Sequence, residues 1–252
     1  MSTTLTNSLA TDFNYNVLGN SLLQDFEMLF AIFFIMIYFL FKLGAGPFYT
    51  WTVEVYNACS TGALFIVSLV PKLIYLPMLF FLLYYNFLEY VKFWSVLLLV
   101  IGLLTVFIGS FGILITDKLK EIYAWSSITH TGNMIILLSI LSKISLTFLM
   151  FYLISYYFIS FGFVIILISL QNSTTGRFIK TINQLNGINM LNSSFYLISI
   201  VILASAAGFT PFLSFFMKFS LLTLISSNYG IFITLLVGLL NIVGSVAYLR
   251  ML

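Results

Sequence analysis

Residues 41–48 read Phe-Lys-Leu-Gly-Ala-Gly-Pro-Phe and end an apolar run that begins near Met28. Lys42 is costly there, because a lysine at the centre of a membrane helix costs about 2.5 to over 10 kcal/mol. Glycine relaxes a helix and proline removes a backbone donor, so we expect the helix to break at Gly44 and Pro47. A charge beside a helix break at membrane depth is typical of ion pathways.

The composition of the whole chain predicts an all-α polytopic membrane protein. Of its 252 residues, 62% are hydrophobic and 7% are charged, whereas soluble domains carry about 25% charged residues. The apolar runs are continuous rather than alternating, which argues against a β-barrel. A single cysteine excludes a disulfide framework, and a net charge of +3 gives no reason to expect a nucleic-acid partner.

Apolar spans of roughly the length that crosses a bilayer, about 20 residues, follow a polar leader at 1–26 that has no cleavable signal pattern. We predict about seven transmembrane helices, two of them broken, at 27–48, 60–85, 93–116, 122–141, 147–170, 194–226 and 230–250. The sixth span is too long for one straight crossing and contains Gly208 and Pro211. We therefore expect two half-helices with a break between them.

The two expected breaks share a Gly-x-x-Pro-Phe pattern, at 44–48 and 208–212, and each has a lysine nearby, Lys42 and Lys218. Repeats that carry broken helices at matching places are typical of transporters. Chance is the alternative for so short a match, and the accompanying lysines weigh against it.

Loop charge predicts the orientation. The two sides of the membrane differ in basic residues: Lys118, Lys120, Arg177, Lys180 and Arg250 lie on one, Lys92 and Lys143 on the other. The positive-inside rule places the first side in the cytoplasm or matrix and the N-terminus in the opposite compartment.

Four ionisable side chains fall well inside spans: Lys42, Lys72, His130 and Lys218. Each also has a structural interpretation, because lysine can extend its ammonium to the interface and a lone histidine is often a hydrogen-bonded core residue. Burial disfavours a charged ammonium, a carboxylate favours it, and histidine titrates near neutral pH. We therefore predict a proton relay. The carboxylates lie near span ends, and no metal-ligand cluster, phosphate loop or hydrolase triad is present.

Several motifs, in order, resemble the antiporter-like membrane subunits of respiratory complex I. The first is 41–51 with Val55-Tyr56, and the second is Ser-Leu-Val-Pro-Lys-Leu-Ile at 68–74. The lysine loop and helix at 118–132 include Trp-Ser-Ser-Ile-Thr-His-Thr-Gly, and the last stretches are 207–219 and 241–249. The resemblance implies two inverted five-helix repeats around a polar axis at mid-membrane, with 27–92 as the last two helices of one repeat and 93–252 as the whole of the other.

On this pattern Lys42 and Lys218 match the broken-helix lysines of two half-channels, Lys72 the connecting lysine and His130 the central connecting position. Gly44, Pro47, Gly208 and Pro211 match the breaks. The resemblance implies a subunit of the proton-translocating NADH:ubiquinone reductase of the inner mitochondrial membrane. It would carry no redox chemistry and no cofactor, and its partners would be other membrane-arm subunits and lipids.

The sequence also departs from the family pattern. The family pairs the lysine at Lys42 with a glutamate on an earlier helix that is absent here, and Tyr49 stands where a histidine is usual. We therefore expect a second polypeptide, from a split gene, to supply N-terminal helices and that carboxylate. A cation/proton antiporter subunit and a structural remnant without pumping are the alternatives. Retention of three lysines, each unfavourable in lipid, argues against the remnant.

Overall fold

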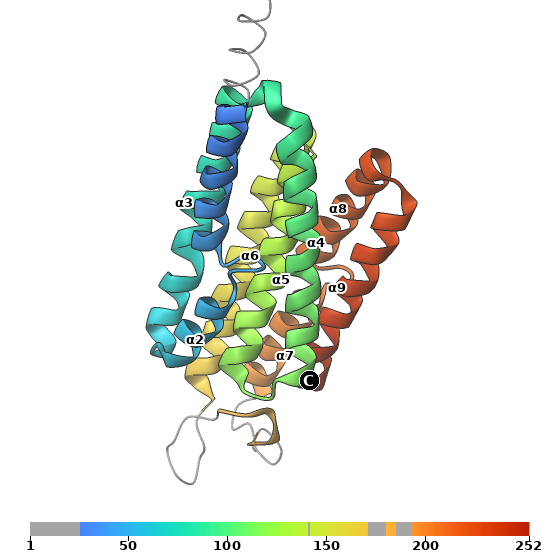
Figure 1. The fold of residues 1–252 in the computed structure, drawn as a ribbon. Coiled ribbons are helices and arrows are strands. Elements are labelled where there is room, and N and C mark those ends of the chain that lie inside the picture. The colour runs from blue at the N-terminus through green and yellow to red at the C-terminus, as the bar shows by residue number, and fades with distance from the viewer. Residues whose placement is uncertain (1–25, 141, 171–179, 185–192, 252) are drawn as a thin grey trace, which may run out of the picture.

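The computed structural model describes residues 26–140, 142–170, 180–184 and 193–251, and these form a bundle of α-helices (Figure 1). The helices are Phe26–Leu43, α2 (Thr50–Ala58), α3 (Thr61–Asn86), α4 (Val91–Ile115), α5 (Leu119–Ser139), α6 (Lys143–Ser169), α7 (Ser193–Ala207), α8 (Leu213–Tyr229) and α9 (Ile231–Met251). Except for Phe26, the predicted polar leader lies outside the described residues. The division into one partial and one whole repeat stays a prediction.

The prediction of an all-α membrane fold is confirmed. Within the described part of the chain, five helices are long and apolar enough to cross a membrane: Phe26–Leu43, Thr61–Asn86, Leu88–Ile115, Lys143–Ser169 and Ile231–Met251. The other two predicted spans correspond to α5 and to the broken pair α7 and α8. Outward-facing side chains such as Phe30, Ile66 and Phe107 are about half exposed, as expected for a surface that meets lipid.

Helix α5 carries the most polar residues of any long helix, and the bundle encloses it on all sides. It packs closely against α4 because glycines face each other across the contact. A Cβ added to Gly102 would lie 2.6 Å from Cγ1 of Ile136, and one added to Gly132 would lie 2.8 Å from the backbone nitrogen of Val106. Small residues let membrane helices approach backbone to backbone. The polar side chains of α5 are thereby shielded from lipid.

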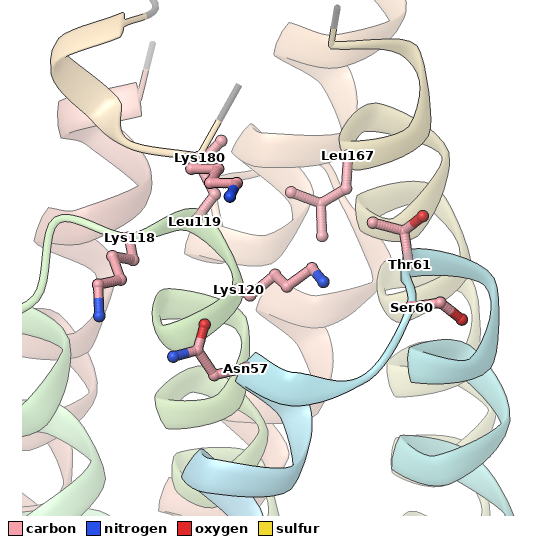
Figure 2. Close-up of a pocket in the computed structure, with 8 residues that line it drawn as sticks. All are labelled: Asn57, Ser60, Thr61, Lys118, Leu119, Lys120, Leu167 and Lys180. Carbon is pink, nitrogen blue, oxygen red and sulfur yellow. The ribbon is translucent and has the colours of Figure 1, made fainter. Parts of the chain in front are cut away.

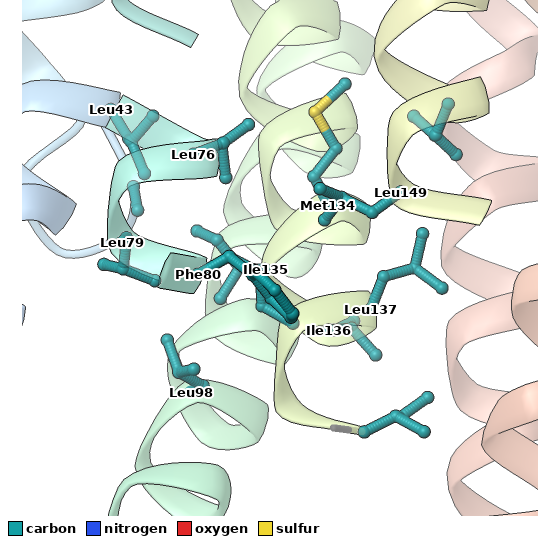
Figure 3. Packing of buried hydrophobic residues seen from close by; sticks show 14 of the residues in the cluster. Leu43, Leu76, Leu79, Phe80, Leu98, Met134, Ile135, Ile136, Leu137 and Leu149 are labelled. Atoms are coloured by element: carbon teal, nitrogen blue, oxygen red, sulfur yellow. The ribbon is translucent and has the colours of Figure 1, made fainter. Parts of the chain in front are cut away.

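The core is built from the faces that α3, α4, α5 and α6 turn toward one another (Figure 3). Leu76 and Phe80 of α3, Leu98 of α4 and Met134 of α5 are almost fully buried, and Leu43 joins them from the end of the first helix. This apolar cluster holds α3, α4, α5 and α6 against one another.

Both predicted breaks interrupt a helix. The first helix ends at Leu43 and α2 begins at Thr50, while α7 ends at Ala207 and α8 begins at Leu213. The residue after each first half is a glycine with positive φ, 67° at Gly44 and 92° at Gly208. Left-handed backbone is costly for other residues, which explains glycine at both positions.

The first break is fastened to the bundle through its backbone. The Gly46 amide donates to Oγ1 of Thr105 at 2.9 Å, and the Trp51 indole N–H donates to the Phe41 carbonyl at 3.0 Å. These bonds satisfy groups that a broken helix leaves without intrahelical partners. The loop is therefore an ordered part of the fold.

The basic residues gather at one end of the bundle, as the loop charges predict. Lys120 Nζ donates to the Cys59 carbonyl at 2.5 Å, and Arg250 donates to the Ile113 carbonyl at 3.0 Å. The backbone of Lys118 forms an isolated antiparallel β-bridge with that of Thr181. The α3–α4 and α8–α9 connections lie at the opposite end (Figure 1). Arg177 lies outside the described residues, and the compartment that each end faces stays a prediction.

Candidate functional site

Lys72, on α3, is 3% exposed and lies in the centre of the bundle. Its ammonium donates to Oγ of Ser127 at 2.6 Å, to the Ser127 carbonyl at 2.9 Å and to the Tyr156 hydroxyl at 2.9 Å. Among the described residues the one ion pair is that between Lys118 and Glu121. Lys72 is therefore held by neutral groups alone, and its Nζ also lies 4.1 Å from the Tyr156 ring centroid. A buried charge without a counter-ion is unfavourable, and its balance of charged and neutral forms responds to any new charge nearby.

His130, on α5, is 5% exposed and lies between two tyrosines of α6. Its Nδ1 is 2.9 Å from the Tyr152 hydroxyl, and its ring centroid is 5.3 Å from that of Tyr156. Tyr156 therefore contacts both Lys72 and His130. Tyr152 and Tyr156 are four residues apart, a spacing that places them on the same face of α6.

The polar path continues from His130 to α9 through two asparagines. Asn133 Nδ2 donates to the Tyr152 hydroxyl at 3.1 Å and to Oδ1 of Asn241 at 2.8 Å, while Asn241 Nδ2 donates back to Oδ1 of Asn133 at 3.3 Å. Paired amides of this kind satisfy each other's donors and acceptors in an apolar surrounding. They join α5 and α9 at the level of the histidine.

His130 also lines a small cavity that it shares with Lys218 of α8, and the walls include Thr129, Asn241 and Tyr248. Its volume is about 10 Å³, close to the least that one water needs. Polar groups surround this space, which favours a water over an empty void. A single water there would connect the histidine to the lysine.

Lys218 lies against the end of the preceding half-helix. Its ammonium donates to the Ala207 carbonyl at 3.0 Å and to the Ala206 carbonyl at 3.4 Å. These belong to the last turn of α7, whose carbonyls the break leaves without helical partners and whose dipole end is negative. The helix break therefore provides a site for the Lys218 ammonium that consists of backbone carbonyls alone.

Lys42 lies apart from the other three predicted relay residues. Of the three lysines only Lys72 is enclosed within the described chain, because Lys42 and Lys218 are partly exposed. The depth of each lysine in the membrane stays a prediction. Lys42 ends the first helix with its ammonium 5.9 Å from the Tyr38 ring centroid, and no described carboxylate lies within 4.0 Å of it. It does not join the path that links Lys72, His130 and Lys218.

Sequence reasoning missed four participants, Asn133, Tyr152, Tyr156 and Asn241, and did not foresee that Ser127 binds Lys72. The available signal was polar side chains in otherwise apolar spans, together with the four-residue spacing of the tyrosines. Tyr and Asn carry no charge at neutral pH, so a search for charged side chains inside the spans does not find them. Their contacts depend on which helices are neighbours, which the sequence alone does not specify.

A helical membrane bundle with two glycine-proline breaks, and with Lys72, His130 and Lys218 along its centre, is typical of an antiporter-like membrane subunit. A comparison with protein families agrees with this class. The chain belongs to the family described as "NADH:quinone oxidoreductase/Mrp antiporter, TM", whose model matches residues 2–243.

Individual curated relatives agree with this family. NADH-quinone oxidoreductase subunit N of Azoarcus sp. (strain BH72) is 29% identical over 92% of this chain and 48% of its own length. NADH-ubiquinone oxidoreductase chain 2 of Rhizopus oryzae is 29% identical over 87% of this chain and 43% of its own. The chain thus spans about half the length of the curated relatives it matches.

Two solved structures share the fold. A chain of the Mrp complex from Dietzia sp. DQ12-45-1b matches with a TM-score of 0.78 and 18% identity, over 88% of this chain and 41% of its own. A chain of respiratory complex I from Thermus thermophilus matches with a TM-score of 0.73 and 20% identity, over 88% of this chain and 48% of its own. At these identities the likeness establishes the fold alone.

Proposed function

We propose that the chain is a proton-translocating membrane-arm subunit of NADH:ubiquinone oxidoreductase, the counterpart of subunit 2, in the inner mitochondrial membrane. Its N-terminus would face the intermembrane space, because the basic end would face the matrix. The observation that carries the proposal is the enclosed contact of Lys72 with Ser127 and Tyr156, next to His130. The names of the curated relatives support the enzyme complex.

The proposed relay runs from Lys72 through the α6 tyrosines to His130 and then to Lys218. A tyrosine hydroxyl accepts a proton and releases another at the same oxygen, so Tyr156 can pass a proton on without a lasting charge. His130 and Lys218 share a cavity of about the size of one water. The His130 and Tyr156 rings lie 5.3 Å apart between centroids without a hydrogen bond of their own, so the proposed relay requires a water between them as well. Lys72 has only neutral partners, so a charge arriving nearby would shift its proton toward or away from Tyr156.

We further propose that Lys42 belongs to the first of the two half-channels, whose acid comes from another polypeptide. Its ammonium is partly exposed and has no described carboxylate within 4.0 Å. A second polypeptide that packs against the first helix would cover the lysine and bring a counter-charge. The other neighbours of this chain would be membrane-arm subunits and membrane lipids. Redox chemistry would take place on other subunits.

A cation/proton antiporter subunit is the second candidate, and the fold likeness to a chain of an Mrp complex favours it. Both candidates use a buried lysine and a relay, so the path geometry is common to them. They differ in what crosses the membrane together with the proton. Counter-transport of sodium by reconstituted protein would favour the antiporter, and proton movement that requires NADH oxidation would favour the respiratory subunit.

The direct test is proton pumping by the intact complex with Lys72→Met in this chain. Membrane vesicles would be supplied with NADH and a quinone, and the ratio of protons moved to electrons transferred would be measured. We expect the ratio to fall while the complex assembles normally on a native gel. Lys143→Met is the matched control, because that lysine lies at the end of α6 outside the path. An unchanged ratio in Lys72→Met would support the structural remnant instead.

A further inference from the structure

A cavity of about 360 Å³ opens at the basic end of the bundle, between α2, α3, α5 and α6 (Figure 2). It is far larger than the cavity beside His130 and is separate from the proposed proton path. Most of its lining side chains are polar or basic: Asn57, Ser60, Thr61, Lys118, Lys120 and Lys180. Leu119 of α5 and Leu167 of α6 add apolar surface to the walls.

Positive charge dominates this cavity. Lys118 pairs with Glu121 at 2.8 Å and turns away from the cavity, while the ammonium of Lys120 points toward Ser60 and Thr61 (Figure 2). Three lysines against one glutamate leave an excess of two positive charges. The first turns of α3 and α5 also line the cavity, and the N-terminal end of a helix dipole is positive. The cavity is therefore suited to an anion.

A second, apolar cavity of about 40 Å³ adjoins the first, since Leu119 and Leu167 line both. It lies between α6 and α7, and its walls include Phe163, Leu203 and Met251. The polar cavity and the apolar one are thus neighbours on either side of these two leucines. A ligand that fills both spaces has an anionic head and a hydrocarbon tail.

We propose that these two cavities bind an anionic phospholipid. Its phosphate lies with Lys120 and Lys180, and one acyl chain passes Leu119 and Leu167 toward α7. Basic pockets between transmembrane helices at the matrix or cytoplasmic side suit anionic headgroups. A free phosphate would meet the lysines but leave the apolar cavity without an occupant, and a zwitterionic lipid would leave the excess charge unmatched.

The test uses the protein in its purified complex, stripped of lipid by detergent and then titrated. The probes are dioleoyl phosphatidylglycerol, dioleoyl phosphatidylcholine, glycerol 3-phosphate and inorganic phosphate, with bound lipid counted by native mass spectrometry. We expect saturable binding of the phosphatidylglycerol and no competition from the two soluble phosphates. Lys180→Gln should weaken binding about fivefold, because one lysine contributes about 1 kcal/mol to attraction by an anionic lipid surface.

Lys180 is the variant of choice because its side chain is exposed, whereas Lys120 also caps the carbonyl of Cys59. Lys143→Gln, at the opposite end of the bundle, is the matched control and should bind as the unchanged protein does. Equal binding of the two lipids, equal weakening by both variants, or displacement of phosphatidylglycerol by inorganic phosphate would each overturn the proposal.

Discussion

At the scale of single residues, the bundle holds its central cation with hydroxyl and carbonyl oxygens. Tyr156 is the residue that contacts both Lys72 and His130. An ammonium with no carboxylate nearby depends on these oxygens for its stabilisation. This arrangement makes the hydroxyl of Tyr156 as important to the proposed relay as either titratable group.

Tyr156→Phe should slow proton pumping while the fold is retained. The change removes one of three hydrogen bonds to the Lys72 ammonium, and a bond to a charged group contributes about 1.5–3 kcal/mol. Pumping rate and thermal stability of the complex would be measured together. Tyr157→Phe is the matched control, since Tyr157 is 38% exposed on the neighbouring position of α6. An equal effect of both substitutions would contradict the assigned role of Tyr156.

Gly208→Ala should disturb Lys218 directly. The added Cβ would lie 3.0 Å from Nζ of Lys218, and the positive φ of Gly208 would add strain of about 1–2 kcal/mol. Gly230→Ala provides the control, because Gly230 has φ of 88° but open space around its Cα. Both variants should lose similar stability in thermal unfolding, and only Gly208→Ala should reduce pumping. Reduced pumping in both would mean that backbone strain, not the lysine, is responsible.

At the scale of elements, the close approach of α4 and α5 is what allows a polar helix to sit inside a membrane bundle. Gly109 of α4 faces the α5 backbone, and an added Cβ would lie 2.9 Å from the amide nitrogen of Thr129. A backbone neighbour cannot rotate away, as a side chain can. The fit of α5 therefore depends on glycine at this position.

Gly109→Ala should destabilise the bundle by about 1–3 kcal/mol, the usual effect of overpacking. Gly244→Ala, in α9, should be neutral or stabilising, because nothing lies within 4 Å of the added Cβ and alanine favours helix over glycine by about 1 kcal/mol. Thermal unfolding in detergent would compare the two. Equal destabilisation by the two substitutions would show that the loss does not come from crowding at the α4–α5 contact.

Element boundaries were predictable from the sequence to within a few residues, because hydrophobic length and the glycine-proline pairs carry strong local signals. The first helix stops at Leu43, directly before the predicted break at Gly44, whereas the short helix α2, which starts at Thr50, was not predicted. The contacts of Tyr152, Asn133 and Asn241 were not predictable. They depend on the packing of α5 against α6 and α9, which no local pattern encodes.

At the scale of the whole molecule, the surroundings of Lys42 at the edge of the bundle are more open than those of the central residues. Lys72 and His130 are enclosed by this chain, whereas Lys42 lies partly exposed beside Tyr38, a residue that is 51% exposed. An ammonium left in lipid is unfavourable by several kcal/mol, on the order of 2.5 or more. Under the proposed function, this face of the first helix is therefore where the second polypeptide packs.

A photo-crosslinking residue in place of Tyr38 should capture that polypeptide within the intact complex. Mass spectrometry of the product should identify a membrane chain with a glutamate or aspartate near the attachment point, because such an acid would pair with Lys42. Adding Lys42→Met should lower the yield, since the pairing helps to hold the two chains in register. Lipid adducts alone, or adducts within this chain alone, would mean that no second polypeptide covers Lys42, and the half-channel assigned to it would have to be abandoned.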